Sequence, residues 1–234
     1  MWSEHLEPIA DAGYRAIALD LPGFGEAPVQ PGEQAPWEDV LRAMRDLETG
    51  PAALVGNSFG GAVALRVAVV APAAVSALAL ISAPAPGVEP SAQLAAAWEA
   101  QEAALEQDDI EGAVDAVLDA WVPPRLRERV APMQRRALEL QAEAGGASEA
   151  PDPLEEIEPL GAVEVPALVA WGEHDMSDFE ESAHALARVL PNARLEMIPG
   201  AGHLAPLETP EAFRELLLGL LGIEASRPSS EGWN

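Results

Sequence analysis

Short β-rich segments alternate with helix-like segments along this 234-residue chain, and the alternation is the strongest constraint on its fold. Strands separated by helices form parallel sheets that helices cover on both faces. The sequence therefore predicts an α/β protein with a mostly parallel, doubly wound sheet. The segments that favour strands are residues 14–19, 52–56, 75–82, 167–171 and 194–198.

The pattern changes after the third of these segments, where Ala, Glu and Leu recur at helical spacing. Residues 84–161 are therefore predicted to form a helical insertion between two strands. The end of the insertion, residues 141–161, is acidic and rich in Gly, Pro and Ala, so we expect a tether rather than a packed element. The predicted core comprises residues 1–83 and 162–223, followed by a disordered tail at 224–234.

Composition excludes several classes of function. The chain contains no cysteine, which excludes disulfides, thiolate nucleophiles and the usual structural zinc sites. Its four histidines show no metal-binding spacing, so we expect neither a metal nor a cofactor. The formal net charge of −26 repels phosphate backbones and anionic headgroups, so nucleic acid and membrane surfaces are not expected partners.

Two segments bear on location. Residues 1–13 have neither a basic start nor an apolar stretch, so they do not form a secretory signal. The apolar run at residues 62–81 contains Arg66 and is broken at Pro72, which argues against a membrane span. The sequence predicts a cytoplasmic protein of undetermined oligomeric state.

Ser58 stands in Gly-Asn-Ser-Phe-Gly-Gly, between the strand candidate at 52–56 and a helix-like run at 59–70. The G-x-S-x-G match alone is weak evidence, but a strand, a turn and a helix around it are what a nucleophile elbow requires. We expect Gly56 and Gly60 to remove side chains that would otherwise clash, and the backbone N–H of Phe59 to face a developing oxyanion. The alternative is a tight glycine turn with an incidental serine.

His203 and Asp175 follow the last two strand candidates. His203 is the predicted general base toward Ser58 and the acid toward the leaving group, although without Ser58 it would be interpreted as an exposed loop residue. Asp175 is the predicted carboxylate that orients the imidazole, because the turn after the strand reaches the active edge there. Glu173, Asp178 and Glu180 are nearby alternatives.

The order Ser58, Asp175, His203, each after a strand, resembles the α/β-hydrolase superfamily. The resemblance implies that residues 84–161 form the helical cap of that family, with Trp98 and Trp121 lining an acyl pocket. Taken individually, each tryptophan would be interpreted as a buried core residue. Further matching segments are Asp-Leu-Pro-Gly-Phe-Gly at 20–25, Pro-Ala-Leu-Val-Ala-Trp-Gly-Glu-His-Asp at 166–175 and Gly-Ala-Gly-His-Leu-Ala-Pro-Leu-Glu at 200–208.

The sequence departs from the family at its start. Relatives begin with a hairpin, a strand and a His-Gly loop before a helix, whereas this sequence starts inside that helix at Met1. We expect an N-terminally shortened fold that lacks the second oxyanion donor, and our hypothesis is a shortened version of a longer protein. The missing strand would lie between residues 14–19 and 52–56, so those strands should either pair directly or leave the sheet split.

Serine at the elbow, in place of aspartate, disfavours haloalkane dehalogenases and epoxide hydrolases of similar fold. The expected function is a serine hydrolase that cleaves a small carboxylic ester or lactone through an acyl-enzyme, with enol-lactonases the nearest type. One alternative is a carbon–carbon bond hydrolase of aromatic degradation, although those enzymes usually carry Trp where this chain has Leu204. The other is a catalytically impaired hydrolase-like domain that binds a small molecule or a partner.

Overall fold

Four parallel strands form the central sheet of the computed structural model, which describes residues 1–144 and 147–222. The sheet order is β2 (Ala52–Asn57), β3 (Val75–Ile81), β5 (Ala167–Gly172) and β6 (Ala193–Ile198). Neighbouring strands pair in parallel throughout, with Leu54 opposite Leu78 and Leu80 opposite Val169. The predicted α/β class and parallel sheet are confirmed, as are the four strand positions from residue 52 onward.

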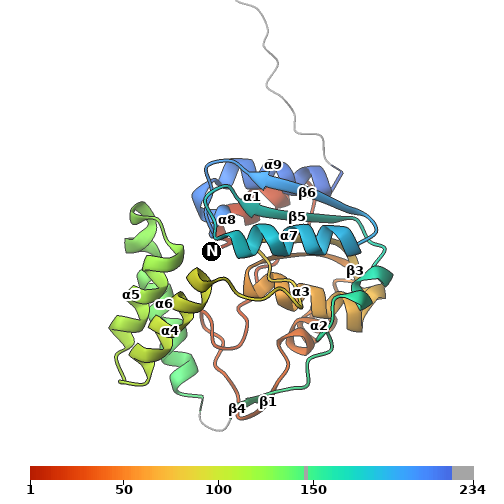
Figure 1. Cartoon of the computed structure of the whole chain (residues 1–234). Helices are drawn as coiled ribbons and strands as arrows, with labels where there is room; N and C mark the ends of the chain where they lie inside the picture. The colour runs from red at the N-terminus through yellow and green to blue at the C-terminus, as the bar shows by residue number, and fades with distance from the viewer. Residues whose placement is uncertain (145–146, 223–234) are drawn as a thin grey trace, which may run out of the picture.

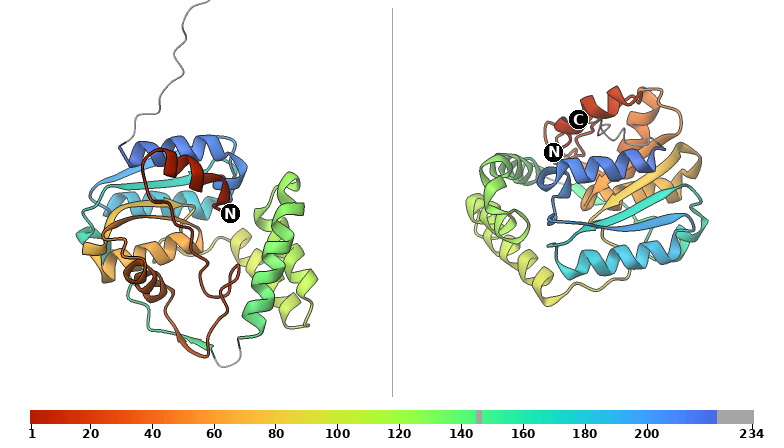
Figure 2. Two further views of the ribbon diagram at one scale, coloured as in Figure 1. Left: turned by 180° about the vertical axis from the view of Figure 1, so that it is seen from behind. Right: turned by 90° about the horizontal axis from the view of Figure 1, so that it is seen from above.

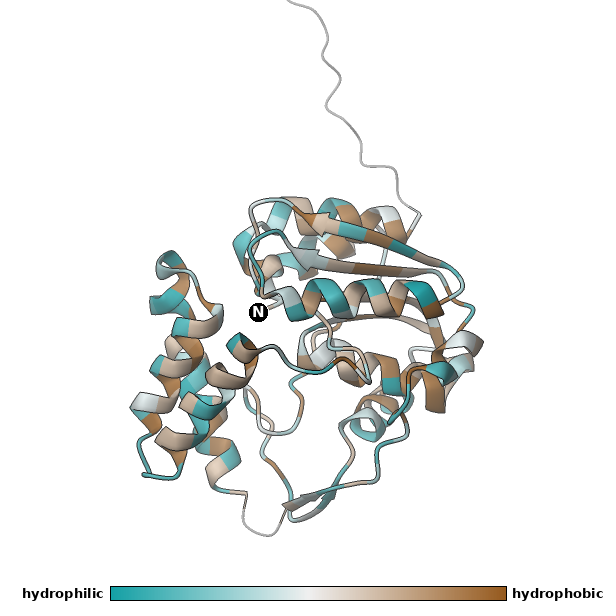
Figure 3. Cartoon of the chain, viewed as in Figure 1, coloured by the Kyte–Doolittle hydropathy of each residue, from teal (hydrophilic) through white to brown (hydrophobic). Residues whose placement is uncertain are grey.

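Helices cover both faces of this sheet (Figure 1). One face packs against α3 (Phe59–Val70) and α7 (Ser177–Val189), with α2 (Pro36–Asp46) outside α3. The other face packs against α9 (Pro210–Leu220), beside which lie α1 (Ser3–Asp11) and the short α8 (Ala205–Glu208). Figure 3 shows hydrophilic and hydrophobic residues alternating along α7, as expected for a helix with one face on the sheet. The sheet is therefore doubly wound.

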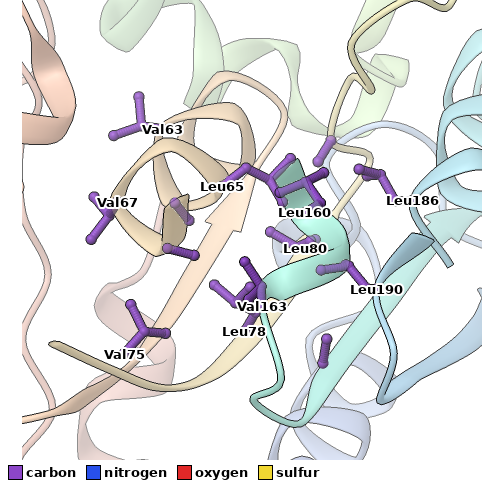
Figure 4. Packing of buried hydrophobic residues seen from close by; sticks show 14 of the residues in the cluster. Val63, Leu65, Val67, Val75, Leu78, Leu80, Leu160, Val163, Leu186 and Leu190 are labelled. Atoms are coloured by element: carbon purple, nitrogen blue, oxygen red, sulfur yellow. The ribbon is translucent and has the colours of Figure 1, made fainter. Parts of the chain in front are cut away.

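The larger core lies between the sheet and the α3–α7 layer. Figure 4 shows Leu65 of α3, Leu80 of β3 and Leu160 lying close together, all of them fully buried. On the opposite face, Ala79 and Ile81 of the same strand pack toward Phe213 of α9. Successive residues of β3 thus contribute to different cores, as the two-residue period of a strand requires. The continuous apolar run in β3 reflects burial on both faces.

The insertion after β3 is helical and packs mainly on itself. It contains α4 (Ala92–Leu105), α5 (Ile110–Trp121), the 3-10 turn η2 (Pro124–Leu126) and α6 (Arg127–Ala142). Figures 1 and 2 show these helices as a separate layer beside the sheet. The Ser91 side chain caps α4 by accepting a hydrogen bond from Leu94 N–H at 3.2 Å. The Asp109 side chain caps α5 by accepting one from Gly112 N–H at 2.9 Å.

The segment expected to be an unpacked tether is partly built into the core. Leu154 and Leu160 are 1% and 0% exposed, the latter within the 3-10 turn η3 (Glu158–Ala162). The side chain of Asp152 accepts a hydrogen bond from Arg66 of α3 at 2.9 Å. The strand β4 (Ala147–Glu149) pairs in parallel with β1 (Gly32–Gln34). The few apolar residues of this acidic segment are buried in the core. The average composition of the segment does not indicate this burial.

The prediction of a strand at residues 14–19 is wrong. The segment is not assigned as a strand, and Tyr14, Ile17 and Leu19 are 38% to 40% exposed. It pairs with β2 neither directly nor through another described strand, so β2 is one of the two edge strands of the sheet as described. A β-strand exists through its ladder hydrogen bonds, and without a neighbour the apolar pattern alone does not create one. Residues 14–19 and β2 instead both line one cavity.

The remaining turn η1 (Pro72–Ala74) connects α3 to β3. No helix in residues 1–144 and 147–222 is both long and apolar enough to cross a lipid bilayer. The predicted tail at 224–234 lies outside the described residues.

Replacing Leu65 by Ala should destabilise the fold. The Leu65 side chain is fully buried in the larger core, so its loss leaves a cavity and should lower the free energy of unfolding by about 2–5 kcal/mol. Urea denaturation followed by circular dichroism measures the change. Val70→Ala is the matched control, because Val70 lies in the same helix and is 47% exposed. Equal midpoints for the two variants would contradict the packing described for α3.

Candidate active site

Ser58 occupies a strained turn between a strand and a helix. β2 ends at Asn57 and α3 begins at Phe59, and Ser58 between them has φ 52° and ψ −120°. Few non-glycine residues adopt a positive φ, and such strain is typical of functional turns. The Ser58 N–H donates to Ile81 O at 2.8 Å, and the Ser58 carbonyl accepts from Gly61 N–H at 2.9 Å. These bonds hold the turn against β3 and α3.

Two glycines, Gly56 and Gly61, permit this turn. The sequence analysis predicts only Gly56. A Cβ on Gly56 would lie 2.3 Å from the carbonyl carbon and oxygen of Gly60, which no side chain tolerates. A Cβ on Gly60 would meet nothing within 4 Å, so the expected clash there is wrong. The second close approach is at Gly61, whose Cβ would lie 2.6 Å from Ala83 Cβ. The first turn of α3 packs on the segment after β3, and Gly61, not Gly60, faces it.

His203 and Asp175 are in direct contact. His203 Nδ1 lies 3.1 Å from both carboxylate oxygens of Asp175, and the two side chains are 8% and 1% exposed. Asp175 Oδ1 also accepts from Met176 N–H at 2.8 Å. An imidazole that donates its Nδ1–H to a carboxylate carries its free lone pair on Nε2. The pair can therefore present a base at Nε2.

The alternative carboxylates have other partners. Glu173 accepts from Gly200 N–H at 2.8 Å, and Glu180 lies 3.9 Å from His184. Asp178 accepts from the backbone and hydroxyl of Ser91, at 2.6 and 2.8 Å. Burial opposes the ionisation of Asp178, but these bonds outweigh it and hold the pKa of that carboxyl below its usual value. Of these four carboxylates, Asp175 is the one that contacts the imidazole.

Two neighbours of His203 escaped the sequence analysis. Asn57 donates from Nδ2 to the His203 carbonyl at 3.1 Å, which joins the elbow to the histidine loop. The ring of Phe179 lies 4.3 Å from the imidazole between centroids, and that of Trp121 lies 5.9 Å away. The position of Asn57 next to Ser58 was a usable signal. No sequence signal pointed to Phe179, which reaches the site only because α7 begins just after Asp175.

Ser58 and His203 line the same cavity of about 1430 Å³, which is largely apolar. No hydrogen bond joins Ser58 Oγ to the His203 imidazole among the described residues, and such contacts often form only with substrate bound. Trp98 and Trp121 also line this cavity. Trp98 is 50% exposed, so its individual interpretation as a buried core residue is wrong.

A backbone donor is available directly after Ser58. The N–H of Phe59, at the start of α3, has no acceptor among the described residues. The N–H of Phe24 is engaged, because it donates to Leu21 O at 2.9 Å, while its ring stacks on that of Phe59 with centroids 5.8 Å apart. The Phe59 N–H is thus free to bind a substrate oxygen at the positive end of a helix.

The turn geometry predicts different effects for two adjacent substitutions. Gly56→Ala should prevent the elbow from closing and lower the melting temperature by about 8 °C or more, since a clash of this kind costs several kcal/mol. Gly60→Ala should leave the melting temperature within about 2 °C of the wild-type value, because the added methyl group meets open space. Thermal unfolding by circular dichroism compares the two. A Gly60 variant as unstable as the Gly56 variant would overturn this description of the turn.

Comparison with known proteins shows which family the chain belongs to. Residues 1–216 match the model of the alpha/beta hydrolase family. The dihydrolipoyllysine-residue acetyltransferase component of the acetoin cleaving system of Pseudomonas putida is 33% identical over 92% of this chain. The chain spans 58% of that relative's length. A 2-hydroxy-6-oxo-6-phenylhexa-2,4-dienoate hydrolase of Burkholderia cepacia is 31% identical, over 94% of this chain and 82% of the relative.

Among solved structures, a hydrolase from Pseudomonas aeruginosa PA01 superposes with a TM-score of 0.76 at 28% identity, covering 95% of this chain and 84% of that one. The family match and the superposition extend over nearly the whole sheet and its helices. The chain therefore belongs to the alpha/beta hydrolase family.

Proposed function

We propose that this protein is a serine hydrolase that cleaves a small carboxylic ester or lactone through an acyl-enzyme on Ser58. The observation that carries the proposal is the His203–Asp175 contact, with Nδ1 3.1 Å from both carboxylate oxygens, in a cavity that Ser58 also lines. A buried carboxylate and imidazole beside a strained serine are the parts that acyl transfer requires.

The proposed mechanism follows from these positions. Ser58 Oγ attacks the substrate carbonyl carbon while His203 Nε2 takes the hydroxyl proton. Asp175 stabilises the imidazolium, and the Phe59 N–H donates to the oxyanion. The imidazolium then returns the proton to the departing alkoxide, leaving an acyl group on Ser58. A water molecule, deprotonated by the same imidazole, hydrolyses that ester and restores the serine.

The surroundings of Ser58 indicate the kind of substrate. Phe24, Phe59, Trp98 and Trp121 line the cavity, which suits an apolar or neutral acyl group. The net charge of −26 disfavours the approach of anionic substrates. We further propose that α4–α6 act as a cap over the site, since Trp98 and Trp121 belong to α4 and α5.

Carbon–carbon bond hydrolysis is the second candidate. It is favoured by the 31% identity to the Burkholderia cepacia hydrolase, whose named substrate is a dienoate. The two candidates differ in the bond that breaks, so an activated ester and a 2-hydroxy-6-oxo-dienoate assayed side by side distinguish them. The third candidate, a binding domain without catalysis, becomes the conclusion if folded protein turns over neither.

Labelling with a fluorophosphonate tests the nucleophile. We expect stoichiometric modification of the wild type, none of Ser58→Ala, and a rate lowered about a thousandfold or more in His203→Ala, because the hydroxyl then lacks its base. Mass spectrometry of the intact protein measures the modification. His184→Ala is the control, since His184 lies exposed on α7. An unlabelled wild type that is folded would end the case for hydrolysis.

Activity should rise as the pH increases from acid to neutral, because a general base must be unprotonated to act. The sign follows from the role of His203: only the neutral imidazole can accept the Ser58 proton, so the active fraction grows as protons leave. Initial rates on p-nitrophenyl acetate, corrected for spontaneous hydrolysis, give kcat/KM across this range. A profile that stays flat while the protein remains folded would exclude His203 as the base.

A further inference from the structure

We propose that Glu208 is a positioning residue for His203. We further propose that Arg125 of the helical insertion keeps the Glu208 carboxylate in place by pairing with it. The inference rests on the proposed function, because it assigns a means of control to the same site. Glu208 ends α8, five residues after His203, while Arg125 lies in η2 between α5 and α6. The two residues come from different layers of the fold and meet beside the histidine loop.

Glu208 lies against the loop on both sides of His203 and bonds it on one of them. Its Oε1 accepts the Leu204 N–H at 3.0 Å, directly after the histidine. Gly202 comes directly before the histidine, and a Cβ there would lie 3.1 Å from the same oxygen. Because glycine has no side chain, the Glu208 carboxylate can occupy this position. The Glu208 side chain is only 4% exposed. Movement of this carboxylate would therefore move the backbone that carries the imidazole.

A buried carboxylate requires compensation for its lost hydration, and Arg125 provides it. Arg125 Nη2 lies 3.5 Å from Glu208 Oε2 and donates to the Glu208 carbonyl at 3.4 Å. Cations are scarce in this chain, with 13 Arg and Lys residues against 39 Asp and Glu, so another cation is seldom near enough to replace it. The order of the histidine loop is therefore coupled to the docking of the insertion.

A second ion pair between the insertion and the core shows why Arg125 is the residue that matters. Arg129 of α6 pairs with Glu4 of α1, but their side chains are 38% and 46% exposed. Water compensates both of these charges when the pair separates, so its contribution is small. Separation of Arg125 instead leaves the carboxylate of Glu208 buried and without its cation. The unpaired charge therefore destabilises the loop that carries His203.

The test compares charge-neutralising variants at both positions. The second-order rate of fluorophosphonate labelling of Ser58 should fall about tenfold in Arg125→Gln, since a buried charge is left unpaired. Glu208→Gln keeps an acceptor for Leu204 N–H and should lose only about threefold, whereas Glu208→Ala should lose about a hundredfold. The control Arg127→Gln removes the same charge from a pair with Asp119 inside the insertion and should stay within about twofold.

The decisive variant is Arg125→Gln combined with Glu208→Gln. Once Glu208 is neutral it no longer needs Arg125, so the double variant should label within about threefold of the wild type, faster than Arg125→Gln alone. Independent losses that multiply, or an Arg125→Gln rate equal to that of Arg127→Gln, would overturn the proposal.

Hydrogen exchange separates this inference from the proposed function. Amides of residues 199–209 should exchange about tenfold faster in Arg125→Gln than in Arg127→Gln, because the loop loses its tie to the insertion. The measurement needs no catalysis. If the wild type does not label but this difference is found, the proposed function fails and the coupling stands. If the wild type labels and the exchange rates are equal, the coupling fails alone.

Discussion

The contact between Gly56 and Gly60 is the constraint on which the candidate site depends. A Cβ at Gly56 would lie 2.3 Å from the Gly60 carbonyl, so the end of β2 and the first turn of α3 touch backbone to backbone. That approach forces Ser58 to the positive φ of 52° and leaves its side chain at the cavity. It also places the Phe59 N–H at the free end of a helix. The positions of the proposed nucleophile and of the proposed oxyanion donor thus follow from one close contact.

The same principle brings the other two residues of the site together. A Cβ on Gly172 would lie 2.2 Å from Gly202 O, so the end of β5 and the loop after β6 also meet backbone to backbone. His174 N–H donates to Ala201 O at 2.8 Å across this contact. Asp175 and His203 each follow the contact directly, which leaves their side chains within hydrogen-bond reach. Parallel strands deliver these loops to one edge, and glycines let them touch.

The extent to which sequence predicted the structure depends on where the signal is local. Strand, turn and helix around Ser58 are specified by adjacent residues, so the boundaries of α3 were correct to the residue. A strand at residues 14–19 would require a neighbouring strand to pair with, and the local sequence pattern does not show whether one is present. Leu154 was missed because burial of one leucine depends on distant partners, not on the acidic composition around it. Gly60 and Gly61 could not be separated without knowing which of them faces Ala83.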